Sequence, residues 1–93
     1  MGKLRARFRN ECENPVTVQA RRRGIAQGSD DCAIEPGQSA TIEIHHRRDD
    51  LSFQASVGGT PLHKTVWPPE GCTDVQYTVL IDINGELQAV LSP

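Results

Sequence analysis

The sequence predicts an all-β protein: a small antiparallel β-sandwich of about 7–8 strands. Apolar side chains recur at every second position through most of the chain, which is the pattern of strands with one buried face. Turn-forming residues separate these segments at intervals of roughly 8–12 residues. No segment carries apolar residues at helical spacing over even two turns. With 93 residues, the chain has room for one domain, residues 1–93, and one core.

Four strands are predicted in the first half of the chain. Leu4, Ala6 and Phe8 share one face of the first strand, and four cations share the other. Asn14-Pro15 marks the break that ends this strand. The later segments with the same alternation are residues 16–21, 32–34 and 40–46, separated by a loop over 24–31 and by Pro36-Gly37.

Four more strands are predicted in the second half, over residues 51–57, 62–67, 75–83 and 86–91. The strongest alternation runs from Val75 to Ile83. Asn84-Gly85, which follows, is the preferred dipeptide for a two-residue type I′ hairpin turn, because both turn positions need a positive φ.

Part of this pattern resembles known sandwich domains. The frame Phe8-Arg9-Asn10, then Val16 and Val18, then Ile34-Glu35-Pro36-Gly37 resembles immunoglobulin-like sandwiches, and it is similar to the β domain of the von Hippel–Lindau protein. The resemblance covers about a third of the chain. It consists of turn and strand patterns, so it implies an immunoglobulin-like fold and carries no function.

The net charge is −2, but the charged residues are distributed unevenly along the chain. Residues 1–23 hold seven cations and two acids, whereas residues 24–93 hold three cations and ten acids. Opposite charges could pair across strands within the fold, or the basic segment could form a face for an anionic partner. Cations at alternate positions of one strand are also how natural sheets protect an exposed edge. The cations of the first strand are Lys3, Arg5, Arg7 and Arg9.

If successive strands run antiparallel, the connections gather at two ends of the sandwich. One end collects residues 10–15, 36–39, 58–61 and 84–85, and the other collects residues 21–31, 45–50 and 67–74. The second end is rich in Arg, His and Trp, and binding residues tend to sit on loops held by a rigid scaffold. The candidate binding residues there are Arg21, Arg22, Arg23, His45, His46, Arg47, Arg48 and Trp67.

The cysteines are three in number, so one bridge at most can form within the chain. Cys32 and Cys72 both fall at the second end, and Cys12 falls at the first. We predict that Cys32 pairs with Cys72 in an oxidising compartment, which would close a loop of about 40 residues and contribute about 3–4 kcal/mol. The alternative is three reduced, partly buried thiols.

Several other chemistries are disfavoured. Adjacent strand residues point to opposite faces, so His45 and His46 cannot easily share a metal; we expect no cofactor, although the paired aspartates Asp30-Asp31 and Asp49-Asp50 offer oxygens to calcium. No nucleophile elbow, SxxK motif or phosphate-binding glycine loop occurs, which argues against an enzyme. Net negative charge and few aromatic residues argue against nucleic-acid binding.

Three functions fit these observations, and the first is a non-enzymatic module that binds another protein. The second is a structural or assembly subunit that forms homo-oligomers through strand edges. The third is a small secreted inhibitor or toxin-like domain that presents the rigid Thr65–Cys72 loop. No apolar run is long enough to span a membrane, and residues 1–15 lack the apolar core of a signal peptide. The compartment and the oligomeric state stay open.

Overall fold

A computed structural model describes residues 3–22, 25–26, 31–45 and 50–92. The described residues form only strands and turns, and none of them belongs to a helix that could cross a membrane. The strands are β1 (Leu4–Asn10), β2 (Val16–Arg22), β3 (Ile25–Ala26), β4 (Cys32–Ile34), β5 (Ser39–Ile44), β6 (Leu51–Val57), β7 (His63–Val66), β8 (Asp74–Ile81) and β9 (Leu87–Leu91).

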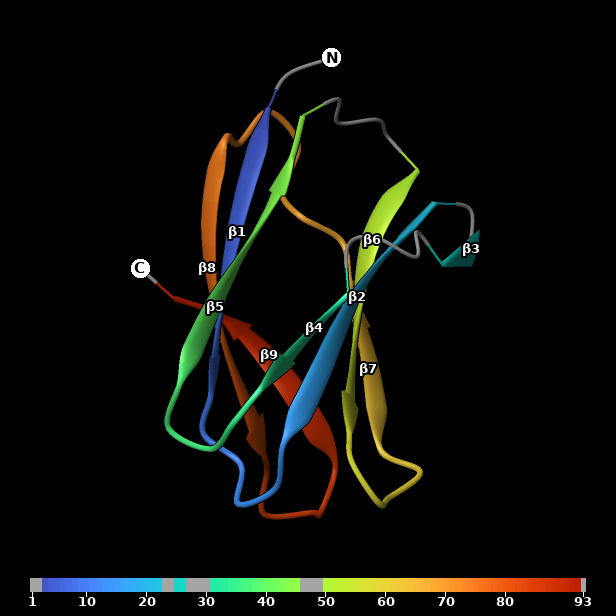
Figure 1. Ribbon diagram of the computed structural model, residues 1–93, viewed down its shortest axis with the longest axis vertical. Coiled ribbons are helices and arrows are strands. Elements are labelled where there is room, and N and C mark those ends of the chain that lie inside the picture. Colours follow the sequence, from blue (N-terminus) through green and yellow to red (C-terminus); the bar gives the residue numbers. More distant parts are fainter. Residues whose placement is uncertain (1–2, 23–24, 27–30, 46–49, 93) are drawn as a thin grey trace.

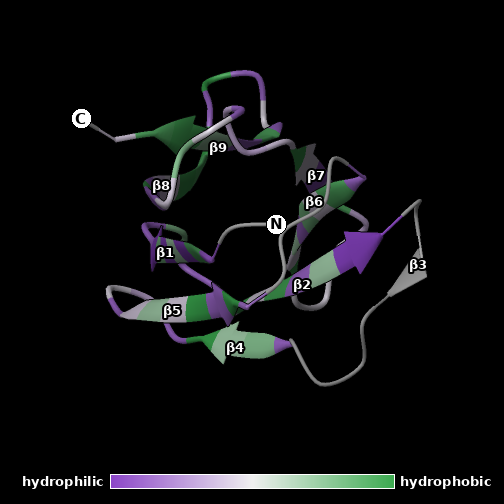
Figure 2. Cartoon of the chain, turned by 90° about the horizontal axis from the view of Figure 1, so that it is seen from above, coloured by the Kyte–Doolittle hydropathy of each residue, from purple (hydrophilic) through white to green (hydrophobic). Residues whose placement is uncertain are grey.

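These strands build two sheets that face each other (Figure 1). The first sheet has four strands in the order β5-β1-β8-β9. The second has five described strands, in the order β3-β2-β6-β7, with β4 also paired to β2. Seen from above, the two sheets stand side by side with apolar segments on both (Figure 2). The predicted all-β sandwich is therefore confirmed at the level of two packed sheets.

The core follows from the alternation in the sequence. Inward positions of β1 and β2 are fully buried while their neighbours are exposed or half-buried. Phe8 of β1 lies edge-on to Phe53 of β6, with ring centroids 5.3 Å apart, and stacks on Tyr77 of β8 at 5.2 Å. Aromatic pairs in these arrangements add stabilisation beyond the area they bury. This cluster joins the two sheets at their centre.

The prediction that all neighbouring strands pair antiparallel, however, is wrong. β1 pairs in parallel with β8, from Arg5 against Asp74 to Asn10 against Val79, whereas the other described pairs are antiparallel. Only a tight hairpin forces two strands to run antiparallel. Six described strands separate β1 from β8 along the chain, so no hairpin sets their relative direction.

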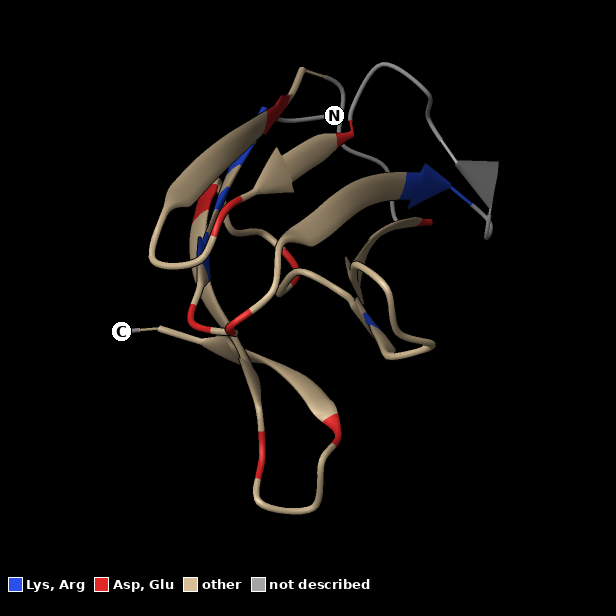
Figure 3. Ribbon diagram, turned by 60° about the horizontal axis from the view of Figure 1, so that its bottom comes forward, with Lys and Arg blue, Asp and Glu red and all other residues tan. Residues whose placement is uncertain are grey.

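The basic first strand does not protect an edge, because β1 lies between β5 and β8 in the middle of its sheet. Its cations therefore project from the outer face of the sheet, where Figure 3 shows them in blue along the strand. The immunoglobulin-like arrangement is not confirmed either. Immunoglobulin domains pair their first two strands within one sheet, and here β1 and β2 belong to different sheets.

The connections lie at two ends of the sandwich, as predicted, because strands that follow one another in the chain run in opposite directions. The β1–β2, β4–β5, β6–β7 and β8–β9 connections meet at the lower end in Figure 1. The end of β5, the start of β6, the β7–β8 connection and the end of β2 lie at the upper end.

Candidate functional site

The candidate binding residues at the upper end are only partly described. Arg21 and Arg22 end β2 and are half-buried, and the Nη1 of Arg21 donates a hydrogen bond to the Oε1 of Gln54 on β6. His45 follows β5 and is exposed. Trp67 follows β7 with 60% of its surface exposed. Arg23, His46, Arg47 and Arg48 lie outside the described residues, as do Asp30 and Asp49 of the calcium alternative.

Cys12 and Cys32 are free thiols, so the predicted Cys32–Cys72 disulfide is not formed in this structure. Cys32 lies on β4 beside β2, in the five-stranded sheet. Cys72 precedes β8 and borders a groove on the four-stranded sheet, and both residues are partly buried against the core. Pairing in an oxidising compartment stays a prediction.

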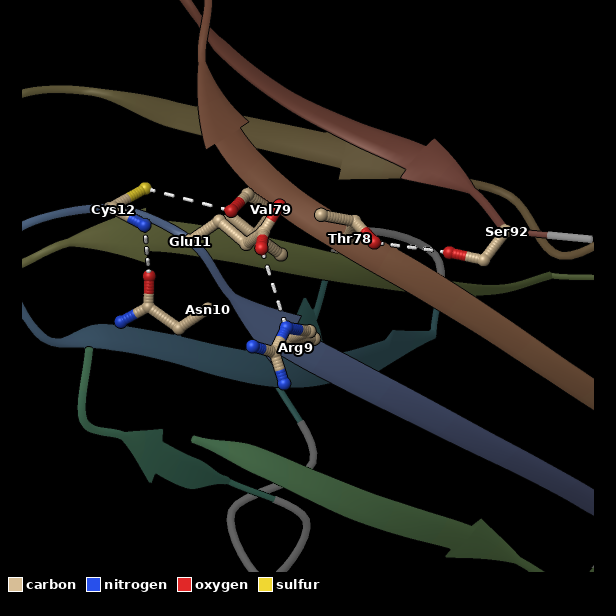
Figure 4. A network of polar contacts seen from close by, with 7 residues as sticks. All are labelled: Arg9, Asn10, Glu11, Cys12, Thr78, Val79 and Ser92. Atoms are coloured by element: carbon tan, nitrogen blue, oxygen red, sulfur yellow. Dashed lines mark hydrogen bonds and ion pairs between the residues drawn. The ribbon is translucent and has the colours of Figure 1, made fainter. Parts of the chain in front are cut away.

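The buried end of β1 holds a polar network, drawn in Figure 4. The fully buried side chain of Asn10 accepts a hydrogen bond from the backbone N–H of Cys12 at 2.7 Å. The thiol of Cys12 donates to the carbonyl of Val79 at 3.8 Å. Burial raises the pKa of the Cys12 thiol. The pKa of the Cys32 thiol is also raised, chiefly by burial and to a smaller extent by the negative charge of Asp31. Both thiols are therefore protonated and weakly nucleophilic at neutral pH.

The outer face of the four-stranded sheet carries a groove of about 760 Å³, here called the sheet groove. Its floor consists of outward-pointing side chains from β5, β1 and β8, and the β7–β8 connection and the end of β9 border it. The lining residues are Arg5, Arg7, Thr41, Glu43, Pro69, Cys72, Asp74, Val75, Gln76, Leu91 and Ser92.

A turn shapes the wall of the sheet groove. The N–H of Cys72 donates to the carbonyl of Pro69 at 3.4 Å, and Gly71, the third residue of this turn, has a φ of +79°. This is the position at which a type II turn requires a positive φ, which glycine adopts without strain. Beyond it, the N–H of Arg5 donates to the carbonyl of Thr73 at 2.8 Å, which fixes the connection to β1.

Most cations of β1, and Lys3 just before it, have carboxylate partners. Lys3 lies 3.2 Å and Arg5 3.9 Å from the same carboxylate oxygen of Glu43 on β5. Hydrogen bonding from Lys3, with its charge, lowers the pKa of Glu43, which is therefore ionised at neutral pH. Arg9 pairs with Glu11 at 3.4 Å. Among the described residues, Arg7 is the cation of β1 that makes no ion pair or hydrogen bond.

The β8–β9 hairpin concentrates the exposed apolar residues. It carries four of the five large apolar side chains that are exposed in the described part of the chain: Ile81, Ile83, Val90 and Leu91. Figure 3 shows this hairpin extending beyond the rest of the molecule.

The carboxylate of Asp82 organises the tip of the hairpin. Its Oδ1 accepts from the N–H groups of Glu86 and Asn84, and its Oδ2 accepts from the amide of Gln88. These bonds, chiefly that from Glu86, lower the pKa of Asp82. The turn differs from the predicted two-residue one: the N–H of Gly85 donates to the carbonyl of Asp82 at 3.0 Å, with the positive φ at Gly85. This is the longer hairpin loop, in which a left-handed glycine follows a turn.

β9 is an edge strand whose outer hydrogen-bonding groups face away from β8. The N–H groups of Asp82 and Ser92 donate to the carbonyls of Glu86 and Gln76, which fixes the alternation of the ladder. The backbone groups of Leu87, Ala89 and Leu91 therefore point outward. Leu87 lies beside the start of β7, whereas Val90 and Leu91 are each 50% exposed.

Sequence reasoning missed the sheet groove, since its residues come from segments far apart in the chain. The cations of the first strand were its one detectable signal. Comparisons of the chain with protein-family models, with curated proteins and with solved structures found no significant match.

Proposed function

We propose that this chain is a non-enzymatic binding module that holds a segment of another protein in the sheet groove. The observation that carries the proposal is the groove itself: a hollow of about 760 Å³ over rigid strands, with Arg7 on its floor. Its volume lies within the range of roughly 300–1,000 Å³ of ordinary ligand sites.

The lining is of the kind that protein interfaces use. Arginine is enriched in interfaces, and hot-spot residues lie in pockets whose surroundings exclude water. The groove combines Arg7 with the exposed residues Pro69 and Leu91, so a partner segment would meet both a charge and an apolar surface. Because the floor belongs to hydrogen-bonded strands, little ordering of the module would accompany binding, and that favours affinity.

Filling the groove with a large side chain should abolish partner binding. The partner would first be captured from the native source with the wild-type chain and identified. We expect Thr41→Trp, in the groove floor, to weaken the measured affinity for this partner at least about tenfold. Thr17→Trp is the matched control, because Thr17 is an exposed threonine on the outer face of the other sheet.

Both variants should keep the far-ultraviolet spectrum of the wild type. An unchanged affinity in Thr41→Trp, or equal losses in the two folded variants, would refute the assignment of the groove as the binding surface.

A specific observation favours a second candidate function, an assembly subunit that pairs through β9. This edge strand has no charged residue or proline, the features with which natural sheets block pairing. Two copies of β9 that pair antiparallel about Ala89 would place Leu87 of one copy against Leu91 of the other. No like charges within β9 oppose this arrangement.

The assembly candidate predicts a dimer that a single charge disrupts. Light scattering after size-exclusion chromatography should give a dimeric mass for the wild type and a monomeric mass for Val90→Lys. Ile83→Lys introduces the same charge at an exposed isoleucine in the hairpin loop, outside β9, and should remain dimeric. A wild-type chain that is monomeric over the whole accessible concentration range rules this candidate out.

A further inference from the structure

We infer that the sheet groove recognises a single carboxylate, anchored on Arg7 and attached to an apolar neighbour in the partner segment. This inference rests on the proposed function, because it names the chemistry of the segment that the groove would hold. The juxtaposition that supports it is an exposed guanidinium, which has no carboxylate partner among the described residues, flanked by two neutral polar side chains on the floor of the groove.

The flanking side chains come from both neighbouring strands. Arg7 is in register with Thr41 of β5 and with Gln76 of β8. Cross-strand partners project from the same face of a sheet at about 5 Å from one another. A carboxylate on the Arg7 guanidinium, which offers a planar fork of N–H donors, could therefore also accept from the Thr41 hydroxyl and the Gln76 amide.

The charges further along the groove select for one negative charge. Arg5 is in register with Glu43 on one side and with Asp74 on the other, and both of these acids line the groove. Glu43 already neutralises part of the Lys3 and Arg5 charge. The two carboxylates lie two residues from Arg7 along β1 and offset the charges of Lys3 and Arg5. Arg7 therefore adds one uncompensated positive charge, which a monoanion balances and a dianionic phosphate exceeds.

The remaining lining of the groove favours a partner segment that carries an apolar group beside its carboxylate. Pro69 and Leu91 line it together with Gln76; Pro69 is exposed and Leu91 is half exposed. An acidic residue followed by a leucine would place its carboxylate on Arg7 and could cover part of this apolar surface. Burying apolar area of this kind is the main favourable term in association.

Blocked dipeptides test the inference by NMR titration of the ¹⁵N-labelled chain. We expect acetyl-Glu-Leu-amide to give saturable shifts at the amides of Arg7, Thr41 and Gln76. Acetyl-Gln-Leu-amide, which lacks only the charge, should bind at least about tenfold more weakly. The phosphoserine analogue should also bind more weakly than the glutamate peptide. Acetyl-Gln-Leu with a free carboxyl end shows whether a chain terminus can supply the carboxylate as well.

Variants locate the site. Arg7→Gln should reduce binding of the glutamate peptide at least about tenfold. Arg9→Gln is the matched control on the same strand and face, because Arg9 does not line the groove and pairs with Glu11. It should bind as the wild type does.

The inference fails if no dipeptide binds, if the glutamine and glutamate peptides bind equally, or if the phosphoserine peptide binds more tightly. These results are separable from those on the proposed function. Loss of the protein partner in Thr41→Trp, with no binding of the glutamate peptide, would retain the binding module and overturn its carboxylate anchor.

Discussion

Replacing Phe8 by alanine is expected to lower the free energy of unfolding by about 3–5 kcal/mol, the cost of removing a buried aromatic side chain and leaving a cavity. Phe8 has no exposed surface. It lies on the central strand of one sheet and touches Phe53 from the opposite sheet and Tyr77 from the neighbouring strand. The substitution would therefore remove contacts both between and within the sheets.

Urea unfolding followed by far-ultraviolet circular dichroism measures this loss. Small domains have total stabilities of roughly 5–15 kcal/mol, so Phe8→Ala is expected to be marginally folded at 25 °C. Phe8→Leu keeps most of the volume and should cost less than about 1.5 kcal/mol, which provides a measurable variant if the alanine form does not fold.

Trp67→Ala is the control for a lost aromatic ring on the surface. Trp67 is 60% exposed, and substitutions at such positions usually change stability by less than about 0.5 kcal/mol. A cost at Phe8→Ala no greater than that at Trp67→Ala would show that the aromatic cluster is not the centre of the core.

The inward residues could be predicted because their signal is local. A strand alternates its side chains between two faces. Five consecutive residues are therefore enough to show that Leu4, Ala6 and Phe8 share one face. The structure buries all three. The sheet order could not be predicted in this way, since the pairing of β1 with β8 joins residues about 70 positions apart and leaves no periodic trace in either segment.

The sheet groove could not be predicted from the sequence for the same reason. The cations of the first strand are visible in the chain, but their meaning depends on whether β1 is an edge strand or a central one. Once β5 and β8 flank it, Glu43 becomes the partner of Lys3 and Arg5, and Arg7 has no carboxylate partner in the described part of the chain. Of the eight residues predicted to form a loop site at the upper end, four lie outside the described part of the chain.

The buried amide of Asn10 is another feature that composition does not reveal. Its Nδ2 donates to the carbonyls of Asn14 and Ile34, each at 2.9 Å, and its Oδ1 accepts from the N–H of Cys12. These bonds tie the end of β1 to the β1–β2 connection and to the end of β4. An asparagine before a turn predicts a local hydrogen bond, but it gives no indication of the contact with Ile34, which lies 24 positions away.

Changing Asn10 to aspartate should lower the free energy of unfolding at pH 7 by about 3 kcal/mol or more. The introduced carboxylate keeps an acceptor for the Cys12 N–H but loses both donors. The carbonyls of Asn14 and Ile34 would then face a negative charge instead of an N–H, and an unsatisfied buried polar group costs about 1–3 kcal/mol, more when charge is involved.

The deficit in Asn10→Asp should also depend on pH with a defined sign. Burial against two carbonyls favours the protonated acid, so the pKa of the introduced carboxyl should be raised above its unfolded value of about 4. A group with a raised folded pKa contributes most below the unfolded pKa and loses that contribution as the pH rises through the folded pKa. The variant should therefore be nearest to the wild type at about pH 4 and furthest from it at neutral pH.

Urea unfolding of both chains at a series of pH values gives this difference directly. Asn14→Asp is the matched control, because Asn14 is exposed on the same connection and should change stability by less than about 0.5 kcal/mol at any pH. A deficit in Asn10→Asp that is small, or that does not grow between pH 4 and pH 7, would mean that the amide protons of Asn10 do not hold β1 and β4 together. The end of the core would then depend on apolar packing alone.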